Sequence, residues 1–237
     1  EFQNKEGKLD FVWQTSWGLS TRSLGGLFLT HGDDNGLILP PKIAPIQVVI
    51  IPIFKVGSNQ SELRRYARDI AQELTLAGVR VKLDEREEPS VGSKFNEWEL
   101  KGVPLRIEVG SREIEDKSLI ITRRDSFAKV KIDRKDLKEK IIESLGQVQV
   151  GLFNRAKKNL RENTHEANSY HEFKKIMAGK RGLIKAFWCE EATCEAKIKE
   201  ETKATTRCLP LEAKEEEGTC VHCGNPASHR WLFAQAY

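Results

Sequence analysis

The stretch Gln47–Ile53, QVVIIPI, decides the fold class of this chain. Its continuous apolar run is typical of a strand that is buried on both faces of a sheet. An amphipathic pattern follows over residues 61–77, with apolar side chains every three or four positions, and Gly78 is placed to end that helix in a left-handed conformation. A buried strand followed by such a helix predicts an α/β domain.

The same alternation continues toward the C-terminus. Residues 79–84, 104–110 and 118–125 are predicted strands, and a polar loop with a short helix lies between the first two of them. KVKID then leads into a helix from about Asp133 to Leu145. This order predicts a mixed sheet with helices on it, in one domain over 44–146.

Before this domain, the chain reads TSWGLSTRSLGGLFLTHGDDNGLILPP over Thr15–Pro41. The alternating run LDFVWQTSW predicts a half-buried strand with Phe11 and Trp13 on one face. Apolar spacing over 24–31 then predicts a short helix whose inner face covers the sheet. We expect the small residues and the arginine of this stretch to line a nucleotide site.

The segment HGDDNG, which should end that helix, carries His31, Asp33 and Asp34. These residue types could bind a metal ion or act as acid and base. Asp, Asn and Gly are also favoured in turns for backbone reasons alone. We therefore interpret the segment as a structural turn.

The start of the chain indicates that it is a fragment. Its only methionine is Met177, and its first residues already approach a strand. One strand and one helix cannot bury a core, so residues 1–43 are predicted to be the end of a domain whose earlier part is absent. The alternative is a processed N-terminus.

Charge and composition set wider limits. The formal net charge is +4, from 39 basic and 35 acidic residues, which permits a nucleic-acid partner without arguing for one. Residues 155–181 carry a local basic excess, which suits either a solvated helix face or phosphate contacts. Neither a membrane span nor a secretory signal is evident, so we predict a cytoplasmic protein with no membrane partner.

The five cysteines form two close pairs and one single residue. Cys189 and Cys194 are spaced C-x4-C, Cys220 and Cys223 are spaced C-x2-C, and Cys208 lies between them. Two such pairs can supply four thiolates in a tetrahedron, which predicts a structural zinc site in a C-terminal domain over 147–237. Disulfides or buried thiols are the alternatives, and Cys208 is interpreted as a packed thiol.

Two histidines near the second pair are reserve metal ligands in this interpretation. They are His222 and His229.

Three stretches together resemble one family. SWGLSTR followed by HGDDNGLILPPKIAPIQVVIIPI resembles the third signature motif of a class II aminoacyl-tRNA synthetase, running into an anticodon-binding domain. SKFNEWELKGVPLRIEVG resembles the anticodon-domain signature of prolyl-tRNA synthetases, and the cysteine pairs resemble the zinc domain of their archaeal and eukaryotic type. The first two class II motifs are missing, so the resemblance implies a C-terminal fragment that is inactive alone.

The resemblance implies roles for the first stretch. The family activates proline with ATP and Mg²⁺ and transfers it to tRNA(Pro). Arg22 would be the catalytic cation facing the ATP phosphates, with Ser20 beside it. The substrate-binding positions would be Ser16, Trp17 and Gly18.

For the anticodon of proline tRNAs, which ends in two guanines, the resemblance favours a charged set after residue 85. Carboxylates can accept from guanine N–H groups, while Lys and Arg can donate to O6 and N7. Phe95 and Trp98 could stack on bases or pack inward. The predicted contacts are Arg86, Lys94, Glu97, Glu99, Lys101 and Arg106.

Two other functions stay open at this point. One is a free-standing tRNA-binding module without catalysis, and the other is a different class II synthetase, such as the threonyl or glycyl enzyme. The resemblance also implies a homodimer for the full-length protein. A final strand is expected in WLFAQAY, although no role is assigned to Tyr237.

Overall fold

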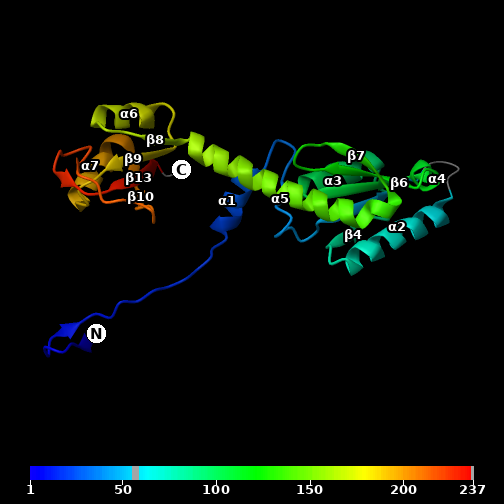
Figure 1. Ribbon diagram of the computed structural model, residues 1–237, viewed down its shortest axis with the longest axis horizontal. Coiled ribbons are helices and arrows are strands. Elements are labelled where there is room, and N and C mark those ends of the chain that lie inside the picture. The colour runs from blue at the N-terminus through cyan, green and yellow to red at the C-terminus, as the bar shows by residue number, and fades with distance from the viewer. Residues whose placement is uncertain (55–58, 236–237) are drawn as a thin grey trace. The chain divides into compact units, whose positions relative to one another are not determined.

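The computed structural model describes residues 1–54 and 59–235, which fall into two compact units, Glu1–Leu152 and Phe153–Tyr237 (Figure 1). The boundary between the units lies within one helix, α5 (Leu137–Glu162). Each unit has a sheet and a hydrophobic core of its own. Tyr237 lies outside the described residues.

The first unit is built on a five-stranded mixed sheet in the order β4-β3-β5-β6-β7. Strand β3 lies between β4 and β5 and is parallel to both, while β6 and β7 continue the sheet in antiparallel pairing. The strands are β3 (Val48–Pro52), β4 (Val81–Leu83), β5 (Leu105–Val109), β6 (Ser118–Arg123) and β7 (Lys129–Asp133). The predicted mixed sheet is confirmed, and KVKID forms a strand of its own before the helix.

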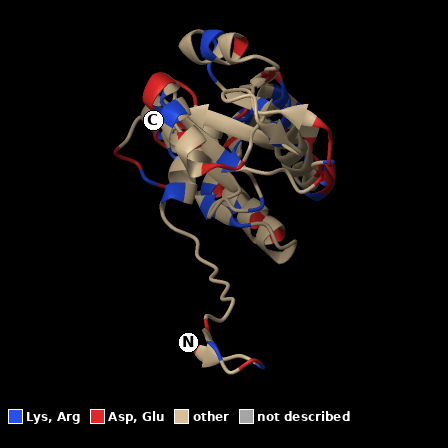
Figure 2. Cartoon of the chain, turned by 90° about the vertical axis from the view of Figure 1, so that its left-hand side faces the viewer, with Lys and Arg blue, Asp and Glu red and all other residues tan. Residues whose placement is uncertain are grey.

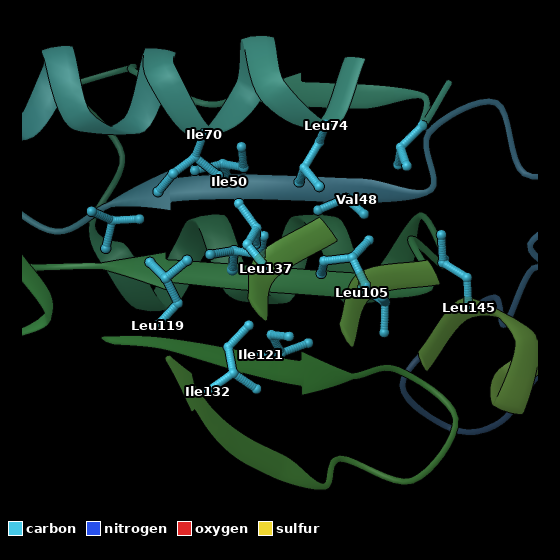
Figure 3. Close-up of a cluster of buried hydrophobic side chains, with 14 of the residues drawn as sticks. Val48, Ile50, Ile70, Leu74, Leu105, Leu119, Ile121, Ile132, Leu137 and Leu145 are labelled. Atoms are coloured by element: carbon cyan, nitrogen blue, oxygen red, sulfur yellow. The ribbon is translucent and has the colours of Figure 1, made fainter. Parts of the chain in front are cut away.

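Helices cover both faces of this sheet, which explains the continuous apolar run in β3. Val48 and Ile50 pack with α2 (Gln60–Leu76) and α5 in the larger cluster (Figure 3). Val49 and Ile51 face the other way, toward Trp98 of α3 (Val91–Leu100). Because successive side chains of a strand point to opposite faces, every residue of β3 is buried.

Two smaller helical elements complete the unit. They are α4 (Ser111–Glu115) and the 3-10 turn η1 (Arg134–Asp136). As predicted, Gly78 has a positive φ, of 82°, after the end of α2. No helix in the described ranges is both long and apolar enough to cross a bilayer.

The predicted end of α5 at Leu145 is wrong, because the helix continues through Gly146 to Glu162. Glycine within a helix costs about 1 kcal/mol relative to alanine. Val148 and Leu152 continue the buried stripe on the far side of that glycine. The burial of two apolar side chains outweighs one weak position.

The residues that precede the sheet have less structure than their pattern predicts. The short pair β1 (Phe2–Gln3) and β2 (Leu9–Asp10) ends before Phe11, and Phe11 and Trp13 are exposed. The predicted strand over LDFVWQTSW is therefore wrong beyond Asp10. An alternating stretch becomes a strand only beside a pairing partner, and among the described residues none lies next to 11–20.

The helix predicted over 24–31 is present as α1 (Arg22–His31), and Gly32 caps it. The packing predicted for it is not found, because no residue of α1 is buried.

The second unit contains a four-stranded sheet in the order β10-β13-β9-β8. Its core joins Phe173 and Met177 to Ile184 and Phe233. The predicted final strand is confirmed as β13 (Arg230–Gln235), which lies between β9 (Leu183–Phe187) and β10 (Ala204–Cys208). The remaining elements are β8 (Thr164–Glu166), α6 (Tyr170–Ala178), α7 (Ala192–Thr202), β11 (Gly218–Thr219) and β12 (Pro226–Ala227).

Candidate functional site

Charged side chains gather along α3, and a buried aspartate organises them. Asp84 follows β4 and accepts hydrogen bonds from Arg86 Nε at 2.8 Å, Arg86 Nη2 at 2.7 Å and Trp98 Nε1 at 2.8 Å. The Arg86 hydrogen bonds hold the pKa of Asp84 well below its usual range, although burial opposes them. A carboxylate that is charged at neutral pH thus fixes both the arginine and the inward-turned tryptophan.

Arg86, Glu97 and Lys101 form a row on the exposed side of α3. Glu97 accepts from Arg86 Nη2 at 2.7 Å through one oxygen and from Lys101 Nζ at 2.6 Å through the other. The Lys101 and Arg86 hydrogen bonds lower the pKa of Glu97. Lys101 Nζ also lies 4.6 Å from the centroid of the Trp98 ring. The row presents an ionised carboxylate between two cations that solvent reaches.

A second group of charged side chains, centred on Arg106, lies closer to the sheet. Arg106 of β5 donates to Glu99 from Nη1 at 2.5 Å and to Glu108 from Nη2 at 3.1 Å. Its guanidinium carbon is 3.8 Å from the centroid of the Phe95 ring. Arg106 is buried, so it fixes the Glu99 carboxylate more than it offers donors to solvent.

Lys94, like Arg106, is buried and differs in this from the solvent-exposed cations of the row. It is only 2% exposed, and its Nζ contacts the backbone oxygen of Arg86 and lies 4.0 Å from Asp84 Oδ1. Burial lowers the pKa of Lys94, while the Asp84 charge opposes that change. Lys94 holds the Arg86 loop in this structure.

Basic residues (blue) and acidic residues (red) are interspersed along the chain (Figure 2). The row offers an acceptor on Glu97 and donors on Arg86 and Lys101, and neighbouring Glu99 adds a second acceptor. Together they can form several hydrogen bonds with one planar polar ring. Guanine has a matching edge, because its N–H groups meet carboxylates and its O6 and N7 meet cations.

The structure does not bring the predicted nucleotide-site residues into a pocket. Ser16, Trp17, Gly18, Ser20 and Arg22 are all exposed, and Trp17 retains 94% of its accessible surface.

The HGDDNG segment is a turn, as predicted. Asp33 and Gly36 exchange backbone hydrogen bonds of 3.0 Å, and Asn35 N donates to Asp33 Oδ1. Asp33 also pairs with Arg124 at 2.5 Å.

Sequence reasoning missed two residues of this region, Asp84 and Arg124. Asp84 is the last residue of VRVKLD, and Arg124 is the last residue of SLIITRR. Both stretches are predicted strands. A charged residue at the end of a predicted strand was the available signal, although only the fold reveals its partner.

The four paired cysteines come together in the second unit, with all their sulfurs within 4.8 Å of one another. Cys194 lies 3.6 Å from Cys220, and Cys189 lies 3.6 Å from Cys223, measured between Sγ atoms. A zinc–sulfur bond of about 2.3 Å places the sulfurs of a tetrahedral site about 3.8 Å apart. The spacing therefore fits four thiolates around one ion and excludes disulfides between these pairs.

Local backbone geometry creates this cluster. Cys189 follows β9, Cys194 lies in the first turn of α7, and the other two flank the turn after β11. That turn closes through a hydrogen bond from Gly224 N to Cys220 O, and Gly224 has a φ of 75° that favours glycine.

The thiols differ in their pKa values. Burial raises the pKa of Cys189 and of Cys194. Burial also opposes ionisation of Cys220, but backbone N–H donors from Cys223 and His222 outweigh it and lower its pKa to about 7.

The two predicted reserve ligands, His222 and His229, differ in their nearest partners. His222 Nδ1 lies 3.4 Å from Cys194 Sγ, whereas His229 Nδ1 faces Glu190 at 3.7 Å. Cys208 is exposed, so its interpretation as a packed thiol is wrong. It follows the register shift in β10, where its side chain leaves the core.

Comparison with known proteins agrees with this geometry. Residues 47–144 match the family described as "Anticodon binding domain", and residues 170–237 match "Prolyl-tRNA synthetase, C-terminal". The proline–tRNA ligase of Flavobacterium johnsoniae is 45% identical over the whole chain, and that of Christiangramia forsetii is 44% identical. The enzyme of Chlorobium phaeobacteroides is 46% identical over 245 aligned residues.

The chain spans about half the length of these curated relatives, 48% of the first two and 50% of the third. Two matched domains in this order argue against a threonyl or glycyl enzyme. The chain belongs to the prolyl-tRNA synthetase family, and it corresponds to the C-terminal part, in which an anticodon-binding domain precedes the family's C-terminal domain.

Proposed function

We propose that this chain supplies the anticodon-binding part of a proline–tRNA ligase and recognises tRNA(Pro). The row Arg86–Glu97–Lys101 beside α3 carries the proposal, because it lies within the region matched to anticodon-binding domains. The basic excess in residues 155–181 is not needed for this role.

Recognition would proceed by exchange of partners. Glu97 and Glu99 accept from the N1–H and N2–H groups of guanine, while Lys101 and Arg86 donate to O6, N7 or a phosphate. The Arg86–Glu97–Lys101 pairs are partly solvated, so opening them costs little. Arg106 and Lys94 position Glu99 and Arg86 from beneath the surface.

The cysteine cluster is proposed to hold one structural zinc ion. Cys189, Cys194, Cys220 and Cys223 fit a tetrahedral set in spacing and donor type. Four thiolates leave no open position for a substrate, so the ion would stabilise the second unit and take no part in the reaction.

In the longer protein, residues 15–22 would contribute to the activation of proline by ATP with Mg²⁺. Arg22 and Ser20 would face the ATP phosphates, and Ser16, Trp17 and Gly18 would face the proline. We further propose that the chain contains domains over 1–43, 44–146 and 147–237. We also propose a homodimer for the longer protein and a cytoplasmic location, where tRNAs are aminoacylated.

The test is binding of an anticodon stem-loop RNA to this chain. A loop with the GG anticodon should bind more tightly than the same stem with a scrambled loop. Lys101→Ala should weaken GG binding by ~1 to 3 kcal/mol more than scrambled binding. Lys138→Ala, at an exposed lysine of α5, is the matched control and should leave the difference unchanged. Equal binding of both loops would contradict the proposal.

A free-standing binding module remains the alternative, since anticodon binding alone cannot distinguish it. Proline-dependent pyrophosphate exchange decides between the two. We expect exchange in a protein that has the length of the relatives and none in this 237-residue chain. An Arg22→Ala change in the longer protein should abolish exchange and spare RNA binding.

A further inference from the structure

Arg124, a buried arginine, links α3 to the Asp33–Gly36 turn that follows α1. Arg124 comes directly after β6, and only 1% of its side chain is exposed. Its Nη1 and Nη2 donate to the two carboxylate oxygens of Asp33 at 2.8 and 2.5 Å, and its Nε donates to the backbone oxygen of Glu99 at 2.9 Å. The three nitrogens of one rigid guanidinium thus bind two segments that are far apart in the sequence.

Backbone contacts close the same junction. Leu37 N donates to Leu100 O at 3.0 Å, and Leu39 N donates to Gly102 O at 3.2 Å. The segment after the turn therefore lies along the C-terminal end of α3, where Glu99 and Lys101 are located.

Two glycines permit this close approach. Gly36 has a φ of 123°, and a Cβ there would lie 2.6 Å from Leu100 Cα. A Cβ on Gly102 would lie 2.7 Å from the backbone of Leu37. The two segments interlock so tightly that α3 and the turn cannot move independently without breaking these contacts.

We infer that Arg124 and Asp33 form a clamp that positions Glu99 for guanine recognition. The clamp also couples the proposed anticodon surface to residues 33–39, the segment that follows α1. Arg124 holds the backbone of Glu99, while Arg106 holds its carboxylate. Neither Arg124 nor Asp33 contacts the RNA itself, so both are positioning residues. This inference rests on the proposed anticodon function of α3.

The sequence offers a matched pair of variants for the test. Asp33→Asn removes the carboxylate that neutralises Arg124, whereas Asp34→Asn removes the same charge from the exposed neighbouring residue. Both variants change long-range attraction for RNA equally. Only Asp33→Asn leaves a buried guanidinium without its counter-charge.

Affinities for the GG and scrambled stem-loops are measured for the wild-type chain and both variants. Asp33→Asn should lose about 10-fold of the preference for the GG loop, and Asp34→Asn should keep it. Equal preference in the two variants would overturn the clamp. A wild-type chain without preference would instead refute the anticodon function.

Hydrogen exchange supplies a readout that needs no variant to fold. Because coupling is reciprocal, the GG loop should slow exchange of the Leu37 and Leu39 amides in the wild-type chain, although they do not contact RNA. Protection confined to α3 would overturn the coupling. Without RNA, the Leu37 and Leu39 amides should exchange faster in Asp33→Asn than in Asp34→Asn. Equal rates would show that Asp33 does not hold this segment against α3.

Discussion

The proposed anticodon surface on α3 and the four-cysteine cluster are held together by opposite means. In the surface, Glu97 lies between two cations, so neighbouring charges neutralise one another within the protein. In the cluster, four thiols of one kind converge within 4.8 Å. The proposed anticodon surface thus has its counter-charges within the chain, whereas the cysteine cluster is consistent with a zinc site and would take its cation from outside.

The pKa directions express the same difference. Hydrogen bonds from Lys101 and Arg86 lower the pKa of Glu97, so its charged form is favoured. Burial raises the pKa of Cys189 and Cys194, so their thiolate forms are disfavoured, and a bound cation would favour them.

The largest effect should follow from loss of a metal ligand. Structural zinc sites contribute about 10 kcal/mol or more of apparent binding free energy. Cys194→Ser should therefore remove the metal and unfold much of the second unit. Metal content and proteolysis within residues 153–235 measure this, with Cys208→Ser, at the exposed thiol, as the control. A Cys194→Ser protein that resists protease as the wild type does would break the comparison.

A smaller loss is expected where the first unit depends on its own charges. Asp84→Ala leaves Arg86 and Lys94 without their buried partner and should lower the free energy of unfolding by about 3 kcal/mol or more. Asp69→Ala, on the exposed side of α2, should change it by less than about 0.5 kcal/mol. Urea titration compares the two. Similar midpoints would mean that Asp84 does not organise α3.

Acid should weaken the first unit by a smaller amount. The folded-state pKa of Asp84 lies below its unfolded value, so its charge stabilises the fold above pH 4, and this contribution is lost as the pH falls through the folded-state pKa. The urea midpoint of the wild type should therefore fall more steeply below about pH 4 than that of Asp84→Ala. Parallel pH profiles would refute the role of this charge.

Much of the fold could be predicted because local pattern and tertiary environment agree. The strand VVIIP (Val48–Pro52) is apolar throughout because helices cover both sheet faces, and residues 61–77 show one buried stripe. The cysteine pairs carried the second site in their spacing alone.

The errors arise where distant segments decide the outcome. LDFVWQTSW has a strand pattern without a pairing strand. Gly146 is of a type that often ends helices, but the buried stripe continues past it from Leu145 to Val148. Lys94 and Arg124 look like surface cations in the sequence, and only their partners Asp84 and Asp33 show that they are buried.

The most direct test of the account is RNA binding before and after removal of the metal. The GG and scrambled stem-loops are titrated against the zinc-loaded chain and against the same chain after chelation, with proteolysis as a monitor of the second unit. We predict that chelation loosens residues 153–235 while the preference for the GG loop changes by less than about twofold. Loss of that preference together with the metal would contradict the claim that the anticodon surface is complete without the cysteine cluster.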